Sequence, residues 1–214
     1  METVRGLSTS ERQTVPDRYA MPNLMTIHHK LTGSTIFSRL DLIKAYHFIP
    51  VAEEDISKTA ICTPFGTYEY LRMPFGLRNW ASTFQRFIDN ILREFPFALS
   101  YIDDILIFSK TMDEHTTHLK SIFEKLNSAG LKLNDDKSLL FQTSINFLGY
   151  HFNSKGIKPL PERVTALQEL TEPKDNKELR RILGMFGFYQ RCISNYAVIV
   201  DPLRDLLNSS HRNT

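Results

Sequence analysis

Apolar positions recur along this chain with two periods, and each period is typical of one class of element. Between residues 35 and 42, and again between 98 and 108, they alternate or form short runs rich in β-branched and aromatic residues, which predicts strands. Elsewhere a spacing of three and four residues predicts amphipathic helices. We expect these helices over residues 21–31, 81–94, 114–129, 162–170, 177–193 and 201–207.

Further strands are expected over residues 58–63, 68–72, 131–134, 137–141 and 145–152, most of them joined by turn residues. Together the elements predict an α+β fold, an antiparallel sheet with helices on one face, over a main domain of residues 21–156. The composition changes at Ile157, and a small helical subdomain is expected over residues 157–207. Residues 1–20 lack a periodic apolar face, so we expect a poorly ordered lead-in, and residues 208–214 should fray.

Two adjacent acids, Asp103 and Asp104, interrupt the apolar stretch 98–108. The pattern predicts a β-hairpin with these two residues at its tip. Carboxylates beside so much hydrocarbon are costly unless a cation meets them, and a hard divalent ion such as Mg²⁺ takes carboxylate oxygens. A solvent-facing turn, in which the acids only suit the turn, is the alternative.

A lone acid, Asp41, lies in the strand expected over residues 35–42, between Leu40 and Leu42. By itself it is compatible with an exposed or salt-bridged position. If this strand neighbours the acidic hairpin, three carboxylates converge at one sheet edge. Two metal ions about 3.5–4 Å apart need such a cluster, and they can activate a hydroxyl and neutralise a departing pyrophosphate.

Composition limits the alternatives. The chain has 214 residues, is 42% hydrophobic and 23% charged, and has a net charge of +2, so nucleic-acid binding has to come from local patches. Cys62 and Cys192 lack metal-ligand spacing and are expected to be free thiols. No apolar run reaches about 18 residues and the first 20 residues are polar, so we expect an intracellular protein with no membrane partner. His115 and His118 have no further ligands nearby in the sequence and are expected on a solvated helix surface.

Five motifs occur in an order that resembles the reverse transcriptases of gypsy-type long-terminal-repeat retrotransposons. The resemblance runs from about Thr14 to Leu207, and the spacing of the motifs makes it specific. The motifs are Phe37-Ser38-Arg39-Leu40-Asp41-Leu42, Pro64-Phe65-Gly66, Met73-Pro74-Phe75-Gly76-Leu77, Tyr101-Ile102-Asp103-Asp104 and Phe147-Leu148-Gly149.

The resemblance implies a polymerase palm followed by a helical thumb, and two catalytic ions, Mg²⁺ or Mn²⁺. Asp41 and Asp103 match the main ligands of both ions, with help from the carbonyl of Leu42. Asp104 matches the third acid. Lys137 resembles the lysine that protonates pyrophosphate, a general-acid role, although a solvated lysine explains it equally well.

The resemblance also implies how substrates are held. Tyr46 matches an aromatic steric gate that selects deoxynucleoside triphosphates against a ribose 2′-hydroxyl, with an ordinary core aromatic as the alternative. Phe75 matches the residue that packs on the incoming nucleotide. Phe147-Leu148-Gly149 resembles the primer grip. Lysines and arginines of the thumb would contact the phosphates of an RNA or DNA template–primer duplex, although a solvated charged face explains the same residues.

The chain departs from the family pattern at several places. The basic fingers residues and a Tyr-Arg motif that usually precede Thr14 have no match in residues 6–13, so the fingers are expected to be largely missing. Charge stabilisation of the triphosphate should then be weaker. Trp80 replaces a small residue near the template path, and Phe48 replaces a glutamine.

The function expected from the sequence is therefore that of an RNA-directed DNA polymerase fragment. Two alternatives stay open. One is a catalytically impaired remnant that binds nucleic acid, and the other is a different palm-type nucleotidyltransferase or cyclase, against which the motif at residues 147–149 and the thumb-like helices count.

Overall fold

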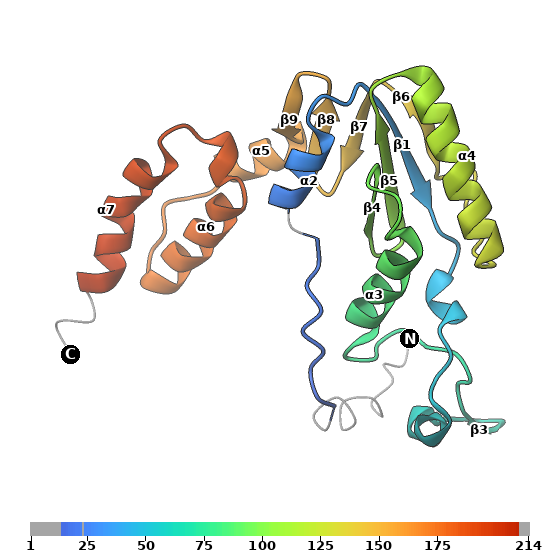
Figure 1. Ribbon diagram of the computed structural model, residues 1–214. Helices are drawn as coiled ribbons and strands as arrows, with labels where there is room; N and C mark the ends of the chain where they lie inside the picture. The colour runs from blue at the N-terminus through green and yellow to red at the C-terminus, as the bar shows by residue number, and fades with distance from the viewer. Residues whose placement is uncertain (1–13, 23, 210–214) are drawn as a thin grey trace. The chain divides into compact units, whose positions relative to one another are not determined.

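The computed structural model describes residues 14–22 and 24–209 (Figure 1). The chain divides into two compact units between Ile145 and Asn146, and each is described by itself. The subdomain bounds expected from the sequence, 21–156 and 157–207, stay a prediction. Among the described residues, no helix is both long and apolar enough to cross a bilayer.

A four-stranded sheet organises the first unit, with the strand order β4-β5-β1-β6. Its strands are β1 (Ile36–Asp41), β4 (Ala98–Tyr101), β5 (Asp104–Ser109) and β6 (Leu139–Gln142). Each neighbouring pair is antiparallel. The central pair, β1 with β5, runs in unbroken register from Ile36 opposite Ser109 to Asp41 opposite Asp104.

Two helices, α3 (Trp80–Leu92) and α4 (Met112–Ser128), cover one face of this sheet (Figure 1). Leu40 and Leu42 of the β1 region and Ile105 and Ile107 of β5 join the same buried cluster as the apolar stripes of both helices. Since successive side chains of a strand point to opposite faces, Asp41 lies on the face away from these helices. The predicted α+β fold with helices on one face of an antiparallel sheet is confirmed.

Smaller elements complete the first unit: α2 (Leu24–Leu31), the 3₁₀ helices η1 (Ala45–Phe48) and η2 (Glu53–Thr59), and the hairpin of β2 (Ile61–Thr63) and β3 (Gly66–Tyr68). Residues 14–20 form neither helix nor strand but lie along α3, where Asn79 hydrogen-bonds to Asp17 and Val15. Arg86 forms an ion pair with Asp17. The poorly ordered lead-in expected for residues 1–20 otherwise falls outside the described residues.

The second unit contains the β8–β9 hairpin and three helices. Its elements after β7 (Ser144–Phe147) are β8 (Tyr150–Asn153), β9 (Gly156–Pro159), α5 (Pro161–Gln168), α6 (Asn176–Phe188), the 3₁₀ helix η3 (Gln190–Cys192) and α7 (Tyr196–Ser209). The single strand expected over residues 145–152 is wrong, because the chain turns at Leu148 and Gly149. Both residues have positive φ, 51° and 81°, which is typical of a type I′ hairpin turn.

The two histidines of α4 are not on a solvated surface, and the sequence-based prediction for them is wrong. His115 is fully buried, and His118 stacks on Phe97 with the ring centroids 3.5 Å apart. The two ring nitrogens of His115 lie 2.7 Å from the hydroxyls of Ser38 and Ser109. A buried polar side chain is stable when it is hydrogen-bonded in this way. Cys62 and Cys192 are free thiols, as expected, and both are exposed.

Burial, with a smaller effect from His118, lowers the pKa of His115 to about 4. The unfolded chain, in which this histidine has an ordinary pKa near 6.5, therefore binds more protons between about pH 4 and 6.5. We predict that His115 removes roughly 2 kcal/mol of the free energy of unfolding as the pH falls from 7.5 to 5.0. Urea unfolding of the wild type and of His115→Asn at both pH values measures this loss as a difference. His47→Asn, at an exposed position, is the control, and equal pH dependence in wild type and His115→Asn would contradict the prediction.

Candidate active site

The antiparallel register of β1 and β5 places two of the predicted acids opposite each other. Asp41 ends β1, Asp104 begins β5, and the two are paired residues on the same face of the sheet. Like charges directly opposite across two strands destabilise each other. This end of the sheet is therefore a place where a cation is favoured.

Asp103 lies beside this pair, but the hairpin differs from the one expected. The two-residue turn consists of Ile102 and Asp103, because Asp104 already pairs with Tyr101 as the first residue of β5. The prediction that Asp103 and Asp104 form the tip is wrong by one residue. Ile102 adopts φ 52°, an unfavourable value for a β-branched residue.

The Asp103 carboxylate carries the clearest sign of an incomplete site. Its Oδ1 atom is buried and has no hydrogen-bond partner among the residues that the structure describes. Burial, and then the charges of Asp41 and Asp104, raise the pKa of Asp103. A buried carboxylate oxygen without a partner is costly, so the fold holds this group at the expense of stability.

Asp104 has a cationic partner of its own. The Nε atom of Arg39 lies 3.9 Å from its Oδ1 atom, with both side chains partly exposed. Burial raises the pKa of Asp104, whereas Arg39 and the more distant charge of Lys137 act in the opposite direction, and Asp41 raises it further. Arg39 is two residues from Asp41 on the same strand face, so the alternation of β1 brings it to the acids.

Hydrogen bonds to the main chain fix the end of β1. The amide of Leu42 donates to the carbonyl of Asp103, 3.0 Å away, and the amide of Asn134 donates to the carbonyl of Asp41, 2.8 Å away. The hydroxyl of Ser138 accepts from the Asp41 amide. The loop with Lys137 is thereby held beside the acids, where this lysine is exposed and acts on Asp104 through its charge.

Tyr46 and Phe75, the residues expected to shape the nucleotide site, are brought together. Their ring centroids lie 3.7 Å apart, with Tyr46 buried in η1 and Phe75 more than half exposed. Burial, followed by the charge of Asp103, raises the pKa of the Tyr46 hydroxyl. Tyr46 is therefore near enough to Asp103 for the charge of this acid to act on its hydroxyl. Trp80 packs edge-on against Phe75 at 5.7 Å.

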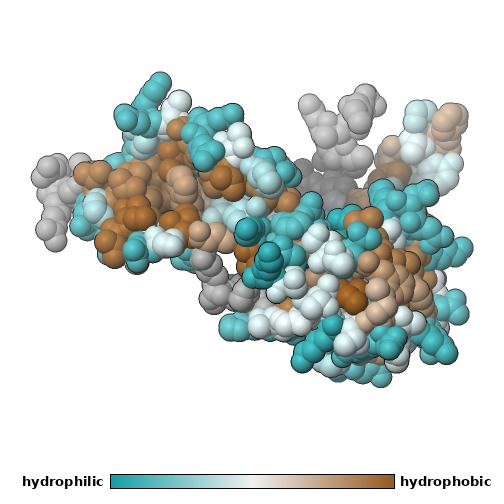
Figure 2. All heavy atoms as spheres, turned by 90° about the horizontal axis from the view of Figure 1, so that it is seen from above, coloured by the Kyte–Doolittle hydropathy of each residue, from teal (hydrophilic) through white to brown (hydrophobic). Residues whose placement is uncertain are grey.

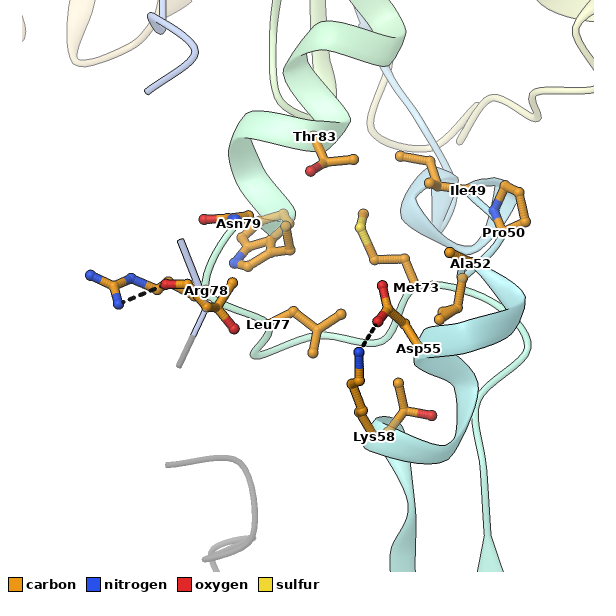
Figure 3. Close-up of a pocket in the computed structure, with 14 residues that line it drawn as sticks. Ile49, Pro50, Ala52, Asp55, Lys58, Met73, Leu77, Arg78, Asn79 and Thr83 are labelled. Atoms are coloured by element: carbon orange, nitrogen blue, oxygen red, sulfur yellow. Dashed lines mark hydrogen bonds and ion pairs between the residues drawn. The ribbon is translucent and has the colours of Figure 1, made fainter. Parts of the chain in front are cut away.

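A cavity of about 590 Å³, lined in part by Trp80, lies between η2 and the start of α3 (Figure 3). Met73 and Leu77 point into it, and Lys58 and Asp55 form an ion pair at its edge. It contains none of the three acids, so it is separate from the candidate metal site.

The predicted primer grip belongs to the second unit. Leu148 and Gly149 line a cavity of about 400 Å³ together with residues of α5 and α6, among them Arg163 and Phe188. Apolar surface gathers over the α6 and α7 part of this unit in Figure 2. The exposed apolar side chains of these helices are Phe188, Val198, Ile199, Leu203 and Leu206.

The donor set fits a hard divalent ion in its chemistry, but the side chains are not gathered around one point. Carboxylates are the preferred protein ligands of Mg²⁺, and the Oδ1 atom of Asp103 has no hydrogen-bond partner in the described part of the chain. Within the described part of the chain, however, no group of three or more His, Cys, Asp or Glu side chains is set closely enough to hold a metal ion. Asp41 and Asp103 are therefore the better candidates, since Asp104 is engaged with Arg39.

Sequence reasoning missed Gln85, although a signal was available. This residue lies three and seven positions before Ile88 and Leu92, on the apolar stripe of α3, and it is fully buried. A polar residue on a buried stripe indicates a specific partner. Here the partner is the turn itself, because the Gln85 side chain accepts from the Ile102 amide at 2.8 Å.

Comparison with known proteins places the chain in a family of nucleic-acid polymerases. The chain belongs to the family described as reverse transcriptase (RNA-dependent DNA polymerase), whose model matches residues 5–152. Within that family it is similar to the Pol polyproteins of long-terminal-repeat retrotransposons, and the expected gypsy-type resemblance is confirmed.

Three curated relatives show the extent of the similarity. The chain is 46% identical to the Pol polyprotein from transposon 297 of Drosophila melanogaster, over 91% of this chain and 18% of that protein. It is 37% identical to the Pol polyprotein from transposon gypsy of the same organism, over 93% of this chain and 19% of the relative. The Tf2-3 polyprotein of Schizosaccharomyces pombe is 38% identical, over 92% of this chain and 15% of that protein. The chain thus spans less than about a fifth of the length of these relatives.

Solved structures agree with this assignment. A foamy viral protease–reverse transcriptase in complex with double-stranded DNA matches with a TM-score of 0.82 and 26% identity, over 94% of this chain and 35% of that one. The foamy viral protease–reverse transcriptase in complex with an RNA/DNA hybrid matches with a TM-score of 0.73 and 27% identity, over 92% of this chain and 27% of that one.

Replacing Asp103 by asparagine should stabilise the protein in the absence of divalent ions. The raised pKa means that the folded state binds more protons than the unfolded state above the ordinary aspartate pKa, so the charged carboxylate costs stability at neutral pH. We predict that Asp103→Asn raises the free energy of unfolding by up to about 1 kcal/mol at pH 7 in EDTA. Urea unfolding measures it, with the exposed Asp113→Asn as the control. A loss of stability in Asp103→Asn would contradict this account of the site.

Proposed function

We propose that this chain catalyses the templated addition of deoxynucleotides to the 3′-hydroxyl of a primer, with two Mg²⁺ or Mn²⁺ ions. The observation that carries the proposal is the placement of Asp41 opposite Asp104, with a buried carboxylate oxygen of Asp103 in the adjoining turn that no described residue hydrogen-bonds. Such an arrangement costs stability, and a divalent ion held by these oxygens would repay that cost.

Asp41 and Asp103 would hold the ions, with Asp104 as the third acid and the carbonyl of Leu42 as a further ligand. The hydrogen bonds at the end of β1 use the Leu42 amide and the Asp41 carbonyl, which leaves the Leu42 carbonyl for this role. When bound, the two ions would activate the primer hydroxyl and neutralise charge on the departing pyrophosphate. Arg39 would orient Asp104 through its ion pair.

The nucleotide would lie against the aromatic pair. Phe75 is exposed and offers a face on which a base or sugar can pack, while the buried Tyr46 below it would exclude a 2′-hydroxyl. Lys137, on the exposed loop beside the acids, would donate a proton to the pyrophosphate as a general acid.

The partner would be a template–primer duplex of RNA or DNA. Support comes from the foamy viral relatives, whose structures hold double-stranded DNA and an RNA/DNA hybrid. The turn at residues 147–149 would act as the primer grip, and the cavity beside it carries one cation, Arg163, for a backbone phosphate. Residues 157–207 would serve as the thumb.

One observation favours a second candidate, a catalytically impaired protein that only binds nucleic acid. Among the described residues, no three acidic side chains lie close enough together to hold a metal ion, and Arg39 forms an ion pair with Asp104. Such a protein would bind duplexes through phosphate contacts, with an affinity that depends strongly on salt. Replacing Asp41, Asp103 or Asp104 would not lower this affinity.

Primer extension separates the two candidates. With a recessed RNA–DNA or DNA–DNA template–primer, Mg²⁺ and deoxynucleoside triphosphates, the wild type should extend the primer, and Asp103→Asn should lower the rate at least about 100-fold. Asp113→Asn, which removes an exposed acid in the first turn of α4, should leave the rate unchanged.

Duplex binding is measured on the same variants. If the wild type and Asp103→Asn extend the primer at the same rate, and both bind the duplex in a salt-dependent way, the polymerase proposal is contradicted. The result would support the second candidate, a protein that only binds nucleic acid. Absence of duplex binding in the wild type would contradict both candidates.

Shortening Tyr46 should relax sugar selection. Because the ring is packed under Phe75 and next to Asp103, Tyr46→Val opens space at the position expected for the 2′-carbon. We predict that the preference for deoxynucleotides over ribonucleotides falls by about 10- to 100-fold, measured as the ratio of kcat/KM values in single-nucleotide extension. Tyr101→Phe, a partly buried tyrosine in β4, is the control, and an unchanged ratio in Tyr46→Val would exclude the gate.

A further inference from the structure

The turn that carries Asp103 is strained, and local sequence does not favour it. Ile102 holds φ at 52°, a region that β-branched residues rarely adopt. Strained backbone persists only where the surrounding structure imposes it. The side chain that imposes it here comes from α3, outside the motifs that define the site.

Gln85 of α3 binds the entering side of the turn at two residues, Ser100 and Ile102. Its side-chain oxygen accepts a hydrogen bond from the Ile102 amide at 2.8 Å. Its Nε2 atom lies 3.1 Å from the carbonyl and 2.9 Å from the hydroxyl of Ser100, on the strand that enters the turn. Gln85 is fully buried, so no water competes for these bonds.

Asp89 reinforces the direction of the Gln85 amide that the Ile102 amide and the Ser100 carbonyl also require. One turn further along α3, its Oδ1 atom accepts from Gln85 Nε2 at 2.8 Å and from the Ser100 hydroxyl at 2.6 Å. A carboxylate can only accept, so the nitrogen of the amide has to face it, and the oxygen is left for the Ile102 amide. The Oδ2 atom of Asp89 accepts from the hydroxyl of Tyr19 at 2.8 Å.

We propose that Gln85, supported by Asp89, is a positioning residue that holds the Ile102–Asp103 turn and thereby sets the Asp103 carboxylate for a divalent ion. The inference rests on the proposed function for its metal. Tyr19 extends the network, so the segment before α2 contributes to the same geometry. The Oδ1 atom of Asp103 is buried and unpaired among the described residues because the hydrogen bonds of Gln85 keep the turn from relaxing toward a partner.

The test measures the turn and the ion separately. Amide hydrogen exchange of the full chain by NMR reports on Ile102, with the amide of Leu106 in the buried centre of β5 as the internal reference. Binding of Mn²⁺, followed by water-proton relaxation, reports on the carboxylates. The variants are Gln85→Met, which keeps the volume but removes both hydrogen-bonding groups, and Asp89→Asn, which keeps the shape but removes the charge of the acceptor that Gln85 Nε2 and the Ser100 hydroxyl share. Asn90→Met, an exposed position of the same helix, is the control.

We expect exchange at Ile102 to become at least tenfold faster in Gln85→Met, and the Kd for Mn²⁺ to rise at least tenfold, with exchange at Leu106 unchanged. Asp89→Asn should raise the exchange rate at Ile102 and the Kd for Mn²⁺ by smaller factors. Asn90→Met should match the wild type in both quantities. A merely structural role would speed exchange at Leu106 as much as at Ile102, which would overturn the proposal.

Faster exchange at Ile102 with an unchanged Kd for Mn²⁺ would overturn the positioning role while leaving the proposed function intact. If Gln85→Met does not fold, Asp89→Asn gives the same decision from the same two readouts. A folded wild type that binds no Mn²⁺ would contradict the proposed function itself, and with it the metal part of this inference.

Discussion

The antiparallel register of β1 with β5 is the constraint on which the site depends. It places Asp41 opposite Asp104, two like charges across one sheet pair, while the leucines on either side of Asp41 join the core under α3 and α4. A shift of one residue would exchange the two faces and bury the acids among the helices. The apolar alternation of β1 therefore specifies the position of the carboxylates as well as the core.

A second constraint acts on the turn. Three features that are each unfavourable meet there: a β-branched residue at positive φ, a buried carboxylate oxygen with no partner among residues 14–22 and 24–209, and two further acids nearby. These features together lower the stability of the fold, and a cation bound at the site would offset that loss. Arg39 offsets part of the repulsion at Asp104, and the hydrogen bonds of Gln85 hold the turn against relaxation.

Much of this could be predicted from the sequence, because the acids interrupt patterns of two-residue period and because five motifs occur in order. The family and the α+β fold follow from those patterns. The turn could not, since φ 52° at Ile102 depends on a hydrogen bond from a helix 17 residues away. The turn at Leu148 and Gly149 could not be predicted either, because leucine disfavours the positive φ that Leu148 adopts. The burial of His115 could have been predicted, because this residue continues the apolar stripe of Leu119, Ile122 and Leu126 on α4.

The central claim is that Asp41 and Asp103 together hold a divalent ion at the end of the β1–β5 pair. Anomalous diffraction from crystals grown with Mn²⁺ locates such an ion directly. The account predicts a peak within bonding distance, about 2.0–2.3 Å, of a carboxylate oxygen of Asp41 and the Oδ1 atom of Asp103, and no such peak in Asp103→Asn. A wild-type crystal with Mn²⁺ bound only elsewhere, or a peak that persists in Asp103→Asn, would contradict it.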